Sequence, residues 1–144
     1  MNRRLLSLAL LLLCSVAGAQ NRFSCNFELF DTSSGKDKSL MKGVAYVQDL
    51  CYRVETEDGY VRGNGTDRWI YYAKTLELVI QKDDSSIFSK ITLTKAGEGS
   101  ATVKYADYKA VLSSIKVTEE QPESFFSVST SSISKDVIIT DLRD

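Results

Sequence analysis

The sequence of 144 residues contains no histidine, one proline and three cysteines. The absence of histidine excludes histidine-based acid–base catalysis, serine–histidine–aspartate triads and every histidine metal site. Only Cys25 and Cys51 lie beyond the first twenty residues, which is too few for a structural zinc site. No basic block occurs and the formal net charge is −1, so we expect no nucleic acid as a partner.

The N-terminal segment has the order of a secretory signal. Basic Asn2-Arg3-Arg4 precedes an apolar run from Leu5 to Leu13, and Ala17-Gly18-Ala19 offers small residues before a cleavage site. The run is shorter than the roughly 20 apolar residues that span a bilayer. We therefore expect residues 1–19 to be a cleaved signal peptide and residues 20–144 to form one periplasmic domain, with secretion as the alternative.

Short alternating segments separated by turn residues fill the mature sequence. In Arg22–Phe30, Phe and Leu residues alternate with polar ones, as in a half-buried strand. Asn64-Gly65 is a strong hairpin signal. Further strands are expected over residues 44–48, 51–57, 60–61, 68–72, 76–81, 87–95, 100–105, 109–119 and 136–141. This pattern predicts a mainly β fold, a single antiparallel sheet that is curled or nearly closed, with few or no helices.

The cysteines lie in two of the predicted strands, and an exported protein could join them in a disulfide. The strand over residues 44–48 is expected to lie between the strands of Cys25 and Cys51. Adjacent strands are about 4.8 Å apart, so two spacings exceed the reach of a disulfide. Free thiols are the alternative that this geometry favours.

Candidates for catalysis are few. Glu55 and Glu57 fall on one face of a predicted strand, as an acid–base pair would require. Arg53 shares that face, so a solvated charged surface is the simpler interpretation. The serine-rich stretch 127–134 has no nearby base that would activate a nucleophile. We predict that the protein is not an enzyme and uses neither a metal nor a cofactor.

The abundant signal is aromatic, with six phenylalanines, seven tyrosines and one tryptophan. A sheet without helices must fold over its apolar face or present that face to a hydrophobic ligand. Trp69 and Tyr71 follow the Asn64-Gly65 turn and, two residues apart, share one face of their strand. That face is predicted to be the ligand-binding one, with core packing of Trp69 as the alternative.

Several blocks of sequence, taken in order, resemble the LolA family of periplasmic lipoprotein carriers. They are Met41–Val47, Tyr52–Glu57, Gly65–Tyr71, Pro122–Phe126 and Val137–Arg143, and they look closest to the LolA-like chaperones of Bacteroidetes-type bacteria. The chain lacks the amphipathic N-terminal helix and the helical lid segments of that family. It therefore looks like an abridged member.

The resemblance implies an open half-barrel whose concave apolar face shelters acyl chains on their way to the outer membrane. The implied partners are an acylated lipoprotein or lipid, with a transient partner at the inner or outer membrane. The alternative is an all-β protein-interaction module without carrier activity, such as a homodimer through the apolar face. The residues predicted to form the lipid-binding face are Phe23, Phe27, Leu29, Val54, Trp69, Tyr71, Leu78, Ile80, Ile91, Leu93, Ile115 and Val117.

Overall fold

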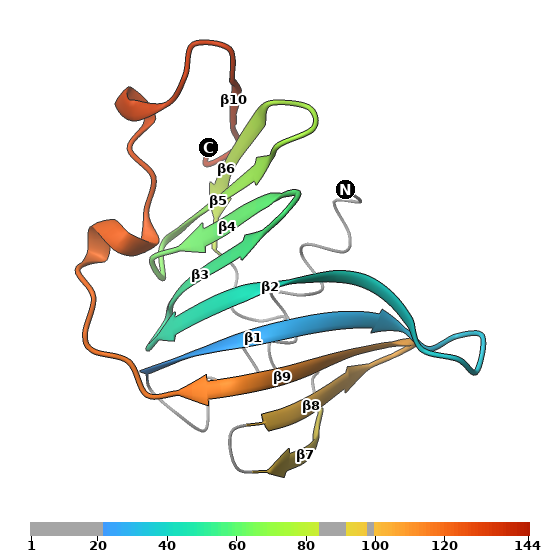
Figure 1. The fold of residues 1–144 in the computed structure, drawn as a ribbon. Helices are drawn as coiled ribbons and strands as arrows, with labels where there is room; N and C mark the ends of the chain where they lie inside the picture. The colour runs from blue at the N-terminus through green and yellow to red at the C-terminus, as the bar shows by residue number, and fades with distance from the viewer. Residues whose placement is uncertain (1–21, 84–91, 98–99) are drawn as a thin grey trace.

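The fold is a ten-stranded sheet followed by a C-terminal segment that crosses it (Figure 1). It is seen in a computed structural model, which describes residues 22–83, 92–97 and 100–144. The strands are β1 (Arg22–Asp31), β2 (Lys38–Gln48), β3 (Cys51–Thr56), β4 (Gly59–Gly63), β5 (Asp67–Tyr72), β6 (Glu77–Lys82), β7 (Thr92–Gly97), β8 (Ser100–Tyr105), β9 (Tyr108–Lys116) and β10 (Ile138–Asp141). Two short 3-10 helices, η2 (Glu123–Phe126) and η3 (Thr130–Ser132), lie between β9 and β10.

The predicted mainly β fold with a single open sheet is confirmed. The strand order is β10-β6-β5-β4-β3-β2-β1-β9-β8-β7, so β10 and β7 are the two edges and the sheet is not closed into a barrel. The predicted signal peptide, residues 1–19, lies outside the described residues, as does the first part of the strand expected over residues 87–95.

The prediction of an entirely antiparallel sheet is wrong at one edge. Strand β10 runs parallel to β6, with Ile138 opposite Glu77 and Asp141 opposite Ile80. The reason is the long connection after β9, which crosses the sheet and enters β10 from the end at which β6 begins (Figure 1). A crossing connection of this length permits a parallel pairing that a tight hairpin does not.

Strand β2 is longer than expected, because it begins at Lys38 and continues through Gly43. A Cβ atom at Gly43 would collide with the backbone carbonyl of Glu55 and press on the ring of Phe27. The missing side chain therefore allows β2 to lie close to β3 while the Phe27 ring fills the remaining space.

The register of the strands separates the side chains into two faces. Residues directly opposite one another in neighbouring strands point to the same side of a sheet. One such row crosses β1 to β6 and consists of Cys25, Ala45, Val54, Val61, Ile70 and Val79. All of them are buried in one apolar cluster that also contains Phe27, so we call this side the Phe27 face.

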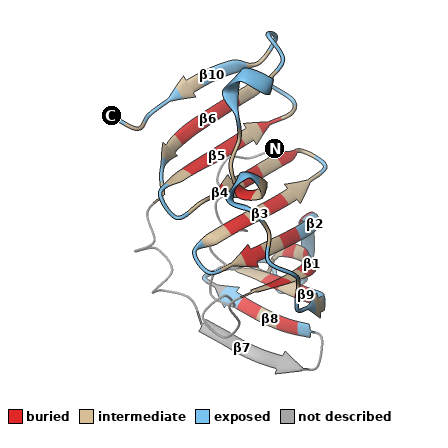
Figure 2. Ribbon diagram, turned by 90° about the vertical axis from the view of Figure 1, so that its left-hand side faces the viewer, coloured by how far each residue is buried: buried red, intermediate tan, exposed pale blue. Residues whose placement is uncertain are grey.

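The opposite side, called here the Trp69 face, has a different composition. Its matching row consists of Ser24, Tyr46, Arg53, Arg62, Trp69 and Ile80. The row is polar at β1, charged at β3 and β4, and apolar at β5 and β6. Figure 2 shows the C-terminal segment passing over this part of the sheet.

Candidate functional site

The Phe27 face is the largest apolar surface in the described part of the chain. Its cluster extends from β6 to β8 and includes Phe23, Leu29, Tyr52 and Leu112, each almost fully inaccessible to solvent. Apart from neighbouring strands, the two described elements that contact each other most are β3 and η2. Helix η2 lies on the other face of the sheet. The Phe27 face therefore has the larger of the two apolar clusters, and an apolar ligand there would have to separate side chains that are already packed together.

The predicted lipid-binding residues do not form one surface. Phe23, Phe27, Leu29 and Val54 lie together in the Phe27 cluster, and Ile115 packs against it. The residues that lie instead on the opposite side of the sheet are Trp69, Tyr71, Leu78 and Ile80. The expectation that all of these residues share one face is wrong.

The physical reason is the register between β4 and β5. Ile70 is opposite Val61 and therefore joins the Phe27 face, which places Trp69 on the other side. In β5 the residues from Arg68 to Ile70 are all buried, so both faces of this strand are covered and alternation does not distinguish them. Packing of Trp69 in an intramolecular core, the stated alternative, is what the cluster with Leu78 and Ile80 shows.

The structure assigns none of the last three predicted residues to either cluster. Val117 follows β9 and is 78% exposed. Ile91 lies outside the described residues, and Leu93 is within β7, where the structure describes the backbone but not the side chain.

The Trp69 face is covered by the chain itself. The segment Gln121–Val137, called here the strap, places Val128, Ile133 and Val137 against the cluster of Trp69, Leu78 and Ile80. Phe126 of the strap is 1% exposed. The aromatic residues on this side consequently have their partners within the protein.

Polar side chains of the sheet hold the backbone of the strap. The Gln48 side-chain amide donates to the carbonyl of Gln121 at 3.0 Å and accepts from its N–H at 2.8 Å. Arg53 Nη1 donates to the carbonyl of Phe125 at 3.3 Å, and Asn64 Nδ2 donates to Glu123 Oε1 at 2.9 Å. The strap is thus attached at several strands and not only by its apolar side chains.

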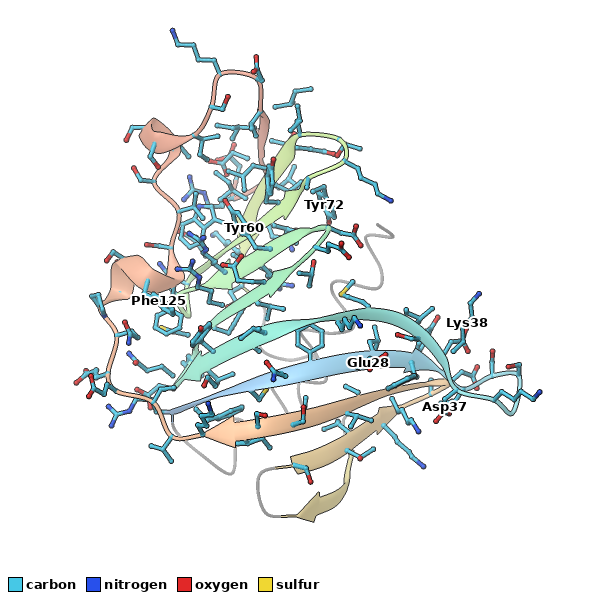
Figure 3. The ribbon with its side chains drawn as sticks, in the orientation of Figure 1. Glu28, Asp37, Lys38, Tyr60, Tyr72 and Phe125 are labelled. Atoms are coloured by element: carbon cyan, nitrogen blue, oxygen red, sulfur yellow. The ribbon has the colours of Figure 1, made fainter. Side chains whose placement is uncertain are left out.

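A charged cluster lies beneath the strap. Glu55 Oε1 accepts a hydrogen bond from Arg53 Nε at 2.7 Å and lies 3.5 Å from Arg62 Nη2. The Arg53 guanidinium is 4.4 Å from the centroid of the Phe125 ring, and Figure 3 shows Phe125 at the strap with Tyr60 on the neighbouring strand. Burial raises the pKa of Tyr60, and the Arg62 charge opposes this. Because Glu55 is held between two arginines, the carboxylate belongs to an ion-pair network and not to an acid–base pair.

A shallow hollow of about 400 Å³ lies over β1, β2 and β9, on the uncovered part of the Trp69 face. Polar Asn26, Glu28, Lys42 and Ser113 contribute to its lining. Glu28, labelled in Figure 3, accepts a hydrogen bond from the Ser39 hydroxyl at 2.5 Å.

A buried ion pair lies at the β5 end of the Phe27 face. Arg68 lies opposite Gly63 and is 5% exposed, and its Nη2 is 3.4 Å from Asp83 Oδ1. The N–H of Asp83 donates to the carbonyl of Thr66 at 3.0 Å, which fixes the acid beside the β4–β5 hairpin. Sequence reasoning missed this pair. The sequence did contain a signal for it. Arg68 is two residues from Ile70 and four from Tyr72, so it points to the same face of the strand as these two apolar residues.

Both described cysteines are free thiols, as the strand order predicts. Cys25 lies opposite Ala45 in β2, whereas Cys51 lies opposite Gln48 of the same strand. Burial raises the pKa of Cys25 to about 12. The pKa of Cys51 is also raised, first by burial and then by the negative charge of Glu123.

No family model matches the sequence, and no curated protein matches it either. Among solved structures, the fold is similar to that of an uncharacterized conserved protein from Thermus thermophilus, with a TM-score of 0.53 and 13% identity. The match covers 92% of this chain and 98% of that one. At this identity the likeness concerns the fold alone. In the described ranges, no helix is long and apolar enough to cross a membrane, and no group of three acids or cysteines is placed to hold a metal ion.

Proposed function

We propose that the protein is a carrier that shelters an acyl chain of a lipid or lipoprotein on the Phe27 face, as the resemblance to the LolA family implies. The observation that carries the proposal is the apolar row that crosses six adjacent strands from Cys25 to Val79. Each methylene removed from water contributes about 0.8 kcal/mol. About ten methylenes then contribute roughly 8 kcal/mol, from which the cost of association must be subtracted.

The open sheet supports the same proposal. The edges β7 and β10 are at opposite ends of the strand order. In a closed barrel, a ligand that enters from the side must break hydrogen bonds between strands. Within the described strands, an acyl chain can enter through a rearrangement of side chains on the Phe27 face, which costs less than the loss of backbone pairing.

The first test is native mass spectrometry of the protein expressed from its full-length sequence in a bacterium and purified without detergent. The proposal predicts added mass that corresponds to a phospholipid or an acylated protein. A protein that carries no lipid, and does not bind a 16-carbon fluorescent fatty acid afterwards, would contradict it.

A matched pair of variants tests which face binds. Val61→Asn places an amide in the apolar row, where the valine is 1% exposed, whereas Val44→Asn changes the same residue type on the Trp69 face. Burial of an unpartnered amide costs about 1–3 kcal/mol. We expect Val61→Asn to weaken acyl binding about tenfold or more per folded molecule, and Val44→Asn to leave it within about twofold. The folded fraction is taken from thermal unfolding, and equal affinities in two folded variants would refute the assignment.

A protein-interaction module is the second candidate, and the edge strand β10 favours it. Ile138, Ile139 and Leu142 are large apolar residues that remain exposed there. Exposed apolar residues on an edge strand invite pairing with another chain. In the same mass spectrum, a lipid-free species with the mass of two chains would support this function and not the carrier.

A further inference from the structure

We infer that the acyl ligand of the Phe27 face carries an anionic head group, a carboxylate or a phosphate ester, and that the Arg68 guanidinium binds it. The inference rests on the proposed function and narrows it to a class of cargo. In its described part, the Phe27 face is apolar across β1 to β4, and a positively charged residue, Arg68, follows at β5.

Arg68 is buried together with one acid. By whole-residue exposure it is the one buried charged residue in the described ranges whose side chains are placed, and its side chain and that of Asp83 are each 7% exposed. A buried charge is costly unless it is paired and hydrogen-bonded. The ion pair with Asp83 offsets part of this cost, but its distance of 3.4 Å leaves the guanidinium able to bind a further anion.

The ring of Tyr52 fills the position beside Arg68. Its row on the Phe27 face runs from Phe23 through Val47, Tyr52 and Gly63 to Arg68. Gly63 has no side chain, and the hydroxyl end of the Tyr52 ring occupies the position that its Cβ would take. A phenol and a guanidinium are thus neighbours in the row, with no aliphatic side chain between them. The apolar residues precede this polar end, in the order in which an acyl chain precedes its head group.

The existing partner leaves part of the guanidinium unused. Asp83 Oδ1 lies 3.4 Å from Nη2, longer than the 2.7–2.9 Å of a strong charge-assisted hydrogen bond. The Nε of Arg68 is buried and has no hydrogen-bond partner in the part of the chain that the structure describes. A guanidinium offers five donors, and its Nε and Nη edge matches two oxygens of a carboxylate or phosphate. Because Nε is buried, that edge becomes accessible to an anion when the side chains that cover it move, and Asp83 can remain at the second hydrogen of Nη2.

Three ligands with the same 16-carbon chain test the inference: hexadecanoic acid, hexadecyl phosphate and hexadecanol. Each displaces a fluorescent fatty acid from the full-length protein, at a pH at which both acids are ionised. Hydrogen bonds to charged groups correspond to roughly a 10- to 100-fold change in affinity. We expect at least one of the two acids to bind about tenfold or more tightly than the alcohol. Preference between the acids identifies the source of the head group.

The variant Arg68→Gln removes the charge, and Arg62→Gln is its matched control. Arg62 is the cross-strand neighbour of Trp69 and contacts Glu55 on the covered face. The preference for the anionic ligand should be lost in Arg68→Gln, retained in Arg62→Gln and largely retained in Arg68→Lys. Circular dichroism reports whether each variant is folded.

The outcomes separate this inference from the proposed function. Equal binding of the three ligands by the unmodified protein overturns the inference and leaves the carrier function standing, and this comparison needs no variant. A preference that survives in a folded Arg68→Gln variant overturns the role of Arg68. Failure of all three ligands to bind overturns the carrier function and the inference together.

Discussion

The attachment of the strap to the sheet makes a quantitative prediction for two adjacent phenylalanines. Phe126 is 1% exposed, so its replacement by alanine removes a fully buried ring. Changes of this kind cost about 3–5 kcal/mol of unfolding free energy. Phe125 is only half-buried, and Phe125→Ala removes ring contacts with Tyr46, with Phe126 and with the Arg53 guanidinium. Each such contact contributes about 0.5–1.5 kcal/mol, so the three together give at most about 4.5 kcal/mol. Because Phe125 is half-exposed and Arg53 keeps its hydrogen bond to the backbone carbonyl, we expect a loss near the lower end, about 1–2 kcal/mol.

Equilibrium unfolding in urea measures both values. Far-UV circular dichroism follows the sheet, and the fluorescence of Trp69 follows the strap, because Trp69 is buried in the cluster that includes Val128 and Ile133. In the unmodified protein the two signals should change together. In Phe126→Ala the fluorescence should change at a lower urea concentration than the dichroism, since the strap detaches before the strands separate.

The ranking of the two variants is the critical result. A Phe126→Ala variant that loses less than about 1 kcal/mol would contradict the cost expected for a buried ring. A loss no larger than that of Phe125→Ala would also contradict it. Either result would mean that the strap is not packed on the Trp69 face in solution.

Two further predictions concern the cysteines and a glycine. Because its raised pKa of about 12 keeps Cys25 in the thiol form, iodoacetamide at pH 8 should modify Cys51 first, as peptide mapping by mass spectrometry would show, and equal rates would contradict the burial of Cys25. Gly63→Ala should cost about 1–3 kcal/mol in urea unfolding, because its Cβ meets the Tyr52 ring, and the cost should fall in a Tyr52→Ala background. An unchanged cost in that background would refute the clash.

The sequence predicts the strands well where one face of a strand is apolar and the other is polar. Strand β1 is the clearest case, since Phe23, Phe27 and Leu29 are buried and alternate with accessible residues. The free cysteines follow from the same reasoning, because β2 separates their strands. Local patterns are sufficient here because the alternation of side chains is set within one strand. Strands β1, β2 and β3 are also consecutive in the sequence and adjacent in the sheet.

The face of Trp69 is not a local property. Strand β5 carries bulky residues on both sides, so its own sequence is compatible with either assignment. The pairing of Ile70 with Val61 decides it, and Val61 in turn is placed by Val54. A one-residue shift in such a chain of pairings moves every side chain of the strand to the other face, so the sequence of β5 alone cannot assign Trp69 and Tyr71 to a face.

The strap was beyond prediction for a related reason. Its contacts join residues far apart in the sequence, such as Gln48 with Gln121 and Arg62 with Ser127. Several of them are made to backbone carbonyls, which every residue possesses. The sequence of the strap therefore says little about where it packs. The parallel pairing of β10 with β6 depends on the path of the strap, so the sequence does not predict that pairing either.

The strap also limits where a ligand can bind. The apolar end of the Trp69 face is already removed from water by Val128, Ile133 and Val137, so a ligand there would have to replace contacts of equal quality. The remaining part of that face mixes polar residues such as Asn26 and Glu28 with apolar Phe30 and Val111, so it offers an acyl chain no continuous apolar row. Only the Phe27 face combines a continuous apolar row with a buried charge at one end. If the protein binds a lipid, the strap therefore directs it to the side of the sheet on which Arg68 lies.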